Sequence, residues 1–149
     1  MNILFVCTGN TCRSPLAAAM ANKLIPTANN SSAGIFALPG QKASLEMINT
    51  ASRYGIDLTK HTSRQVNREM LEQADLILTM TTQHKQALLR AFADVEGLHR
   101  KIFTLSEYVK AGGEIADPYG QGQAMYDLSG EQIYTLIKAL KATLEGRCV

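Results

Sequence analysis

The sequence predicts an α/β fold of three layers, in which helices cover both faces of a four-stranded parallel sheet. Short apolar runs, typical of strands buried on both faces, alternate along the chain with segments whose apolar residues recur at helical spacing. Parallel neighbours in a sheet must be joined by a crossover, and a helix is the usual one. The alternation therefore favours a parallel sheet between two helical layers.

Four segments are expected to form the strands. The continuous apolar runs NILFV (2–6), ADLILTM (74–80) and KIFTL (101–105) have the length and composition of buried strands. The fourth is SSAGI (31–35), where the apolar signal is weaker. In parallel sheets ligands bind at the carboxyl ends of the strands, so the loop after residue 6 lies where a site is expected.

The first helix is expected to start with Ser14 as its N-cap and Pro15 as its first residue. Leu16, Met20 and Leu24 would then lie along one side of it. Further helices are expected over 43–54, 82–92 and 130–145, each with apolar residues at helical spacing.

Length and composition indicate one domain spanning residues 1–149 and exclude several classes of protein. The net charge of +2 is too small to suggest a nucleic-acid partner. No apolar stretch approaches the 18 or so residues of a membrane span, and the short run ILFV is no signal peptide. The three cysteines are an odd number that does not suggest a disulfide framework, so we expect a monomer in the reducing cytoplasm.

The stretch VCTGNTCRSP (6–15) carries the strongest functional signal. Cys7 and Arg13 are separated by five residues, in a loop that follows a strand and precedes a helix. Backbone N–H groups of such a loop, together with the helix N-terminus, suit a tetrahedral oxyanion, and the Arg13 guanidinium can grip two of its oxygens. The same positive environment favours the thiolate form of Cys7, which would be a nucleophile. The phosphate-binding residues are then Thr8, Gly9, Asn10, Thr11, Cys12, Arg13 and Ser14.

Less specific interpretations of these cysteines exist. A cysteine at a strand end is often a small buried hydrophobe. Cys7 and Cys12 could be two metal ligands, but no second Cys or His pair stands at a suitable spacing, so we expect no metal. A proton donor would be needed as well, and Asp117 in ADPYG (116–120) is a candidate, although Asp-Pro is also a common start of a turn.

These residues resemble the low-molecular-weight protein phosphatase family. VCTGNTCRSP is similar to its phosphate-binding loop, SAG (32–34) and HTSRQ (61–65) to internal landmarks, and DPYG to its acid loop. The resemblance runs in order along essentially the whole chain. It implies a four-stranded parallel sheet and hydrolysis of phosphorylated proteins through a phosphocysteine, without metal or cofactor.

The resemblance also implies roles for individual residues. Cys7 would be the nucleophile, Arg13 would clamp the phosphoryl oxygens, and Ser14 would donate a hydrogen bond to the thiolate. Asp117 would protonate the leaving atom and later take a proton from the attacking water. Such catalysis consists mainly of positioning and electrostatic stabilisation.

Three further residues are expected to support or protect the loop. Asn10 would hold its strained backbone, and His61 would bond that asparagine, unless it is simply an isolated histidine. A reversible Cys7–Cys12 disulfide would shield the nucleophile from oxidation, whereas the alternative is that Cys12 only packs in the core. His84 and His99 are expected at the surface, and Tyr126 in packing or at the surface.

The position of Thr11 points to the substrate. Members that act on phosphotyrosine usually have a bulky aliphatic residue there, often isoleucine, whereas the bacterial protein-arginine-phosphatase branch, with threonine there, resembles CTGNTCRS more closely. A guanidinium needs hydrogen-bond acceptors, and Thr11 and Asp117 could supply them. Tyr119 could stack on an aryl ring or on a guanidinium, or be only a loop aromatic. We therefore expect phosphoarginine as the substrate, with phosphotyrosine, or both, as the alternative.

Other functions on related folds fit the sequence less well. Arsenate reduction needs relay cysteines in mid-chain, and the sequence has none between Cys12 and Cys148. A phosphocysteine carrier domain needs neither an arginine clamp nor an acid loop. A catalytically silent binding module would not need Cys7, Arg13 and Asp117 together.

Overall fold

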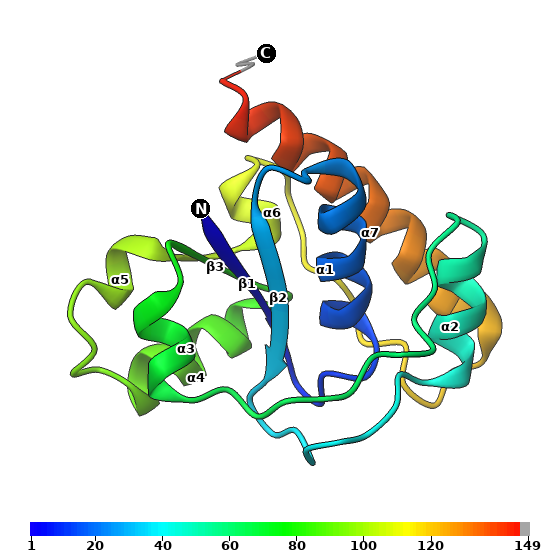
Figure 1. Cartoon of the computed structure of the whole chain (residues 1–149), viewed down its shortest axis with the longest axis horizontal. Helices are drawn as coiled ribbons and strands as arrows, with labels where there is room; N and C mark the ends of the chain where they lie inside the picture. The colour runs from blue at the N-terminus through cyan, green and yellow to red at the C-terminus, as the bar shows by residue number, and fades with distance from the viewer. Residues whose placement is uncertain (147–149) are drawn as a thin grey trace.

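The computed structural model describes residues 1–146 and consists of a parallel sheet between two layers of helices (Figure 1). The strands are β1 (Asn2–Cys7), β2 (Asn29–Gly34), β3 (Leu76–Thr79) and β4 (Ile102–Thr104). They form one sheet in the order β2-β1-β3-β4, and all three pairings are parallel. The predicted three-layer α/β fold with four parallel strands is confirmed.

Strand β1 shows how the sequence builds both layers. Ile3, Phe5 and Cys7 belong to one hydrophobic cluster, whereas Leu4 and Val6 belong to a second cluster. Successive side chains of a strand point to opposite faces, so this unbroken apolar run contributes to the core on both sides of the sheet. The alternation also directs the Cys7 side chain toward the same layer as the helix that follows it.

The helices divide between the two faces according to these clusters. The first face is covered by α1 (Arg13–Leu24), α2 (Leu45–Ser52), α6 (Leu105–Tyr108) and α7 (Gln123–Leu144). The other is covered by α3 (Arg68–Gln73), α4 (Thr82–Ala91) and α5 (Leu98–Lys101). The three four- to six-residue helices α3, α5 and α6 were not expected, because they are too short to show a helical period.

The last helix is longer than the predicted 130–145, since it begins at Gln123. Gly130 disfavours a helix in the sequence, but in the structure it lies inside α7 and faces α2. A Cβ placed there would lie 2.4 Å from the Cγ2 of Thr50. The glycine therefore allows the close packing of α2 on α7, which a pattern along the chain cannot reveal.

The start of α1 also differs from the expectation. The prediction that Ser14 is the N-cap is wrong, because the helix begins at Arg13, with Cys12 at the capping position and no side chain capping it. Ser14 lies in the first turn, fully buried, and its hydroxyl bonds to Cys7 and Asn10. The hydroxyl of Ser14 therefore forms hydrogen bonds with side chains of the loop and does not cap the backbone of the helix.

Four chain segments meet at the carboxyl edge of the sheet, where the first loop lies. Beyond β2, the N–H of Ile35 donates to the carbonyl of Cys7 and that of Phe36 to Thr8. Beyond β3, the N–H of Met80 donates to Val6, and its carbonyl accepts from Ile115. Backbone hydrogen bonds thus connect the loops after β1, β2 and β3 and the segment around residue 115 at this edge of the sheet.

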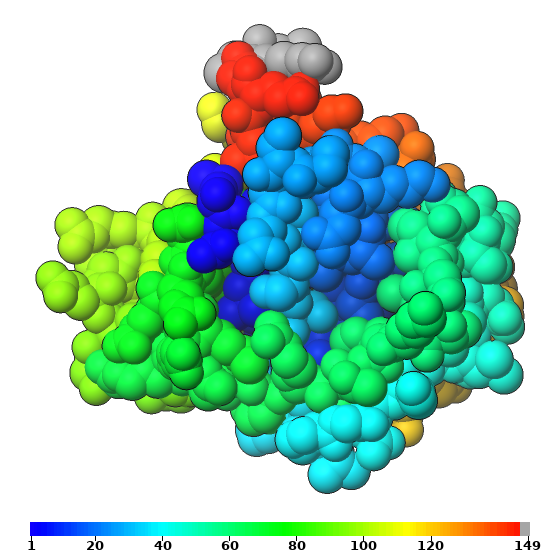
Figure 2. Space-filling view, viewed as in Figure 1, coloured from blue at the N-terminus to red at the C-terminus, as the bar shows by residue number. Residues whose placement is uncertain are grey.

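The surface view shows α1 and β2 side by side at the middle of one face (Figure 2). The segment after β2, in cyan, projects at the lower edge of the same view and carries the exposed side chains of Phe36 and Leu38. Within residues 1–146 no helix is long and apolar enough to cross a membrane. Cys148 lies outside the described residues.

Candidate active site

The loop between β1 and α1 encloses a space at the carboxyl edge of the sheet. Asn10 has a φ of 58°, in the left-handed region that asparagine tolerates better than most residues. Gly34 at the end of β2 approaches this loop closely, since a Cβ there would lie 2.5 Å from the carbonyl oxygen of Thr8. Helix α1 begins where the loop ends and has no acidic residue in its first turn, so its N-terminal partial charge is uncompensated.

The buried amide of Asn10 holds the loop in shape. Its Oδ1 accepts the backbone N–H of Arg64 at 2.9 Å, which fixes the orientation of the amide. Its Nδ2 therefore faces two serines and donates to Ser14 Oγ at 2.8 Å and to Ser32 Oγ at 2.9 Å. Every hydrogen-bonding group of this side chain except one lone pair is used, which stabilises the left-handed backbone.

The same network determines what Ser14 does for Cys7. Ser14 Oγ lies 2.9 Å from the Sγ of Cys7, and both side chains are buried. Because Ser14 already accepts a hydrogen bond from Asn10, its own hydrogen is free to point at the sulfur. A hydroxyl donating to sulfur stabilises the thiolate more than the neutral thiol.

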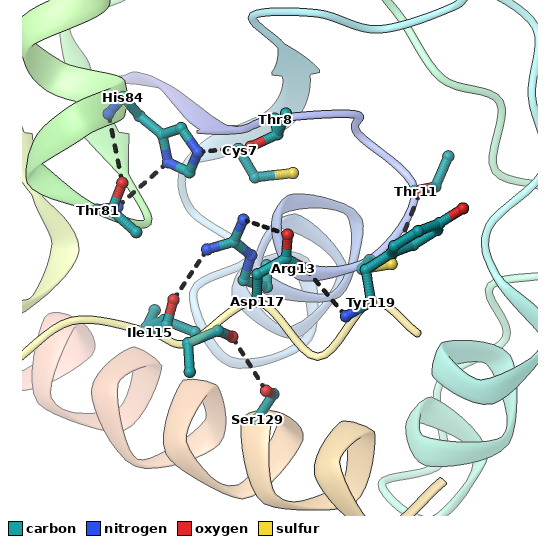
Figure 3. Close-up of polar contacts among 12 residues, drawn as sticks. Cys7, Thr8, Thr11, Arg13, Thr81, His84, Ile115, Asp117, Tyr119 and Ser129 are labelled. Atoms are coloured by element: carbon teal, nitrogen blue, oxygen red, sulfur yellow. Dashed lines mark hydrogen bonds and ion pairs between the residues drawn. The ribbon is translucent and has the colours of Figure 1, made fainter. Parts of the chain in front are cut away.

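Arg13 lies beside the sulfur (Figure 3), and its buried Nε has no hydrogen-bond partner among the described residues. Its Nη1 donates to the carbonyl of Ile115 at 2.9 Å, and its Nη2 lies 3.7 Å from Oδ2 of Asp117. The side chain is almost fully buried, and among the described residues no protein atom accepts its Nε hydrogen. A buried donor without a partner is costly, so an anion is expected to complete the arrangement.

These groups line a pocket of about 240 Å³. It is bounded by Cys7, Thr8, Gly9, Thr11, Cys12, Arg13, Asp117 and Tyr119. All of the predicted site residues lie at the pocket surface except Asn10, Ser14 and His61. Asn10 and Ser14 lie directly behind this surface and bond to each other.

Asp117 and Tyr119 come from the acid loop, on the far side of the pocket from β1. The Oδ1 of Asp117 accepts the backbone N–H of Tyr119 at 3.1 Å, and about half of the Asp117 side chain is exposed. The Tyr119 ring is largely exposed at the rim of the pocket, near Thr11 in Figure 3. The carboxyl group of Asp117 thus lines the same pocket as the sulfur of Cys7.

The side chain of His61 contacts the main chain of the loop. Its Nε2 lies 2.7 Å from the carbonyl oxygen of Asn10, which can only accept, so Nε2 carries the hydrogen. Burial lowers the pKa of His61 and the charge of Arg64 adds to this, while the bond to Asn10 opposes them. The contact expected from the family resemblance is therefore to the main chain of Asn10 and not to its amide.

The expectation that His84 lies at the surface is wrong. His84 is buried at the start of α4, with Nε2 at 2.9 Å from Oγ1 of Thr8, while His99 is exposed as expected. Burial lowers the pKa of His84 to about 4, and the nearby charge of Arg13 contributes. The sequence gives little signal for this residue, because its partner is 76 positions away. The only local indication of its structural role is its position three residues after Thr81, which is a suitable N-cap for α4.

The sulfur of Cys12 contacts two hydroxyl groups, and Cys12 also lines the pocket. Its Sγ lies 3.5 Å from Ser44 Oγ and 4.0 Å from the hydroxyl of Tyr126. Burial and the neighbouring Cys12 raise the pKa of Tyr126 to about 12, so its hydroxyl stays protonated. Cys7 and Cys12 are both free thiols, and the described residues contain no group of three His, Cys, Asp or Glu that could hold a metal ion.

Comparisons with known proteins agree with this geometry. A family model described as low molecular weight phosphotyrosine protein phosphatase matches residues 2–147. The low molecular weight protein-tyrosine-phosphatase PtpB of Staphylococcus aureus is 43% identical, over 95% of this chain and 97% of that protein. A protein-arginine-phosphatase of Geobacillus stearothermophilus is 39% identical, over 96% and 95% of the two chains.

A solved structure is similar to this chain over nearly its whole length. It is a cysteine-to-serine variant of the YwlE arginine phosphatase whose active-site serine is phosphorylated. It superposes on this chain with a TM-score of 0.91 at 37% identity, covering 97% of this chain and 96% of the other.

Proposed function

Because the chain belongs to the low molecular weight phosphotyrosine protein phosphatase family and is a cysteine-dependent protein phosphatase, we propose that its substrate is phosphoarginine on proteins. The observation that carries this choice is that the hydroxyl-bearing Thr11 lines the same pocket as Asp117. Both side chains offer oxygen atoms to the N–H groups of a guanidinium, which would be costly to bury unpaired.

In the first step the Cys7 thiolate attacks phosphorus while the P–N bond to the guanidino group breaks. Ser14 holds the thiolate, and the free Nε of Arg13, the loop N–H groups and the N-terminus of α1 stabilise the phosphoryl oxygens. Asp117 donates its proton to the departing nitrogen. Arginine is a very basic leaving group, so this proton transfer is a large part of the catalysis.

In the second step water hydrolyses the phosphocysteine. Asp117, now a carboxylate, takes a proton from the attacking water as the P–S bond breaks and phosphate leaves. The electron pair of that bond returns to Cys7 as thiolate, which the Ser14 hydroxyl stabilises at 2.9 Å. The enzyme returns to its starting state with no other reactant than water.

Phosphotyrosine is the second candidate, and two observations favour it. The exposed ring of Tyr119 stands at the pocket rim and could stack on an aryl substrate. The PtpB relative, named as a tyrosine phosphatase, is about as similar to this chain as the arginine phosphatase is.

One experiment decides between the two substrates. The specificity constant kcat/KM is measured on matched peptides that carry phosphoarginine or phosphotyrosine at the same position. We expect the wild-type protein to prefer phosphoarginine, and Thr11→Ile to reverse the order because it removes an acceptor and adds an apolar wall. Thr11→Ser, which keeps the hydroxyl, is the matched control and should retain the preference. Faster turnover of phosphotyrosine by the wild-type protein would refute the proposal.

We also propose that Cys7 and Cys12 form a reversible disulfide under oxidation. Peroxide would convert Cys7 to a sulfenic acid, which condenses with the Cys12 thiol and releases water. Both thiols are free and line the same pocket, which supports the pairing. A monomer in the cytoplasm remains our prediction.

A further inference from the structure

The hydrogen bonds around His84 connect helix α4 to the pocket. Its Nδ1 accepts the backbone N–H of Thr81 at 3.2 Å, and Thr81 Oγ1 in turn accepts the N–H of His84 at 3.3 Å. This reciprocal pair caps α4 and holds the imidazole ring in place. The other ring nitrogen, Nε2, points at Thr8 in the pocket (Figure 3).

These contacts determine the tautomer of the ring. A neutral imidazole carries one hydrogen, and Nδ1 must be the acceptor because a backbone N–H points at it. The hydrogen is therefore on Nε2, which donates to Oγ1 of Thr8 at 2.9 Å. Burial beside Arg13 keeps His84 neutral at physiological pH, because its pKa is about 4.

The consequence falls on the hydroxyl of Thr8. Since Thr8 accepts from His84, its own hydrogen is not used in that bond. Thr8 is exposed and lines the same pocket as Cys7 and Arg13. A hydroxyl hydrogen there can donate to an anionic oxygen in the pocket, in addition to Arg13 and the loop N–H groups.

We propose that His84 is a positioning residue that holds the Thr8 hydroxyl as a hydrogen-bond donor to the bound phosphoryl group. The inference rests on the pocket binding a phosphoryl group and not on which phosphoamino acid supplies it. His84 acts through Thr8 and does not itself touch the substrate.

The test uses direct binding of inorganic phosphate, measured by titration calorimetry on the full chain. Thr8→Val removes the donor and keeps the shape of the side chain, so the dissociation constant should rise about tenfold, as for the loss of one hydrogen bond to a charged group. Two variants of His84 separate positioning from folding. His84→Asn can replace the Nδ1 acceptor that caps α4 but not the Nε2 donor, whereas His84→Gln can replace the donor.

We expect His84→Asn to weaken phosphate binding about as much as Thr8→Val, and His84→Gln to bind nearly as well as the wild type. The double variant Thr8→Val with His84→Asn should be no weaker than either single variant, because the two residues act as one unit. His99→Ala, at an exposed histidine outside the pocket, is the control and should change nothing.

The proposal is overturned if His84→Asn binds phosphate normally, if Thr8→Val does, or if the two effects multiply in the double variant. Because the readout is the binding of phosphate, a failure of the phosphoarginine assignment would leave this result unaffected. Thermal unfolding of each variant checks that it is folded. If His84→Asn binds phosphate more weakly but has the same melting temperature as His84→Gln, a purely structural effect is excluded.

Discussion

The amide of Asn10 donates a 2.8 Å hydrogen bond to the hydroxyl of Ser14, and this leaves the hydrogen of Ser14 for the sulfur of Cys7. The orientation of the amide is fixed from behind by the backbone N–H of Arg64. Asn10, Ser14 and Arg64 thus determine the direction of one hydrogen bond at the nucleophile. This series of hydrogen bonds points a hydroxyl donor at the sulfur of the nucleophile.

Replacing Ser14 with Ala removes the donor to the thiolate. We expect kcat to fall about 10- to 100-fold and KM to fall with it, so that kcat/KM changes little, since the bond matters most when the sulfur leaves phosphorus in the second step. A burst of product followed by slow turnover of an aryl phosphate is the kinetic sign. Ser52→Ala, at an exposed serine of α2, is the control. An unchanged kcat would show that Ser14 has no role at the sulfur.

Replacing Asp117 with Asn removes the proton donor without changing its size. We expect kcat on a phosphoarginine peptide to fall about 10²- to 10⁴-fold. The loss should be smaller for an activated aryl phosphate, whose leaving group needs no proton. Equal losses on both substrates would contradict the acid role. Asp94→Asn, at an exposed carboxylate paired with Arg68, should behave as the wild type.

Replacing Gly34 with Ala places a Cβ 2.5 Å from the carbonyl oxygen of Thr8 and 3.0 Å from the backbone nitrogen of Asn10. Because both contacts are backbone, the loop itself must move. We expect a loss of about 1–3 kcal/mol in the free energy of unfolding and much weaker phosphate binding. Gly112→Ala is the control, since no atom lies within 4 Å of a Cβ there. Normal phosphate binding by Gly34→Ala would show that the loop tolerates the shift.

His84 should make the stability of the protein depend on pH. Its pKa is about 4 in the folded chain, against 6.5 as the ordinary value, so the unfolded chain binds more protons between these two pH values. The stability contributed by the neutral ring is fully present above pH 6.5 and is lost as the pH falls toward 4. Arg13, Asp117 and Glu114 face the ring, and Arg13 opposes its protonation while the two carboxylates favour it.

Melting temperatures at about pH 7 and about pH 4.5 test this expectation. The drop between them should be smaller in His84→Gln than in the wild type, because the variant has no group to protonate at this position. His99→Gln, at an exposed histidine, should show the wild-type drop. If His84→Gln loses as much stability in acid as the wild type, then His84 does not titrate as described.

The sequence predicts those parts of the site that are encoded locally. Cys7, Arg13 and the residues between them lie on one loop, so their spacing alone places them around a common centre. The sheet is predictable for the same reason, because its buried strands are continuous apolar runs. The position of Asp117 could be inferred only from the family resemblance, because no local pattern connects it to the loop.

Contacts between distant segments could not be predicted. Arg13 is anchored by a carbonyl 102 positions away, and Thr8 by a histidine 76 positions away. His84 is polar and stands in a segment rich in polar residues, so its burial depends on two hydrogen bonds that only the tertiary structure provides. The sequence predicts the last helix only from residue 130 for a similar reason, because the close contact of Gly130 with Thr50 on another helix leaves no pattern along the chain.

The central claim is that Cys7 accepts the phosphoryl group from phosphoarginine. Rapid mixing with a phosphoarginine peptide, quenching in acid and mass analysis of the intact protein measure this directly. We predict a protein heavier by one phosphoryl group within the first turnover, with the group mapped to Cys7, and none in Cys7→Ala. Release of phosphate from that peptide by Cys7→Ala, or a phosphorylated Cys7 formed from phosphotyrosine but never from phosphoarginine, would contradict it.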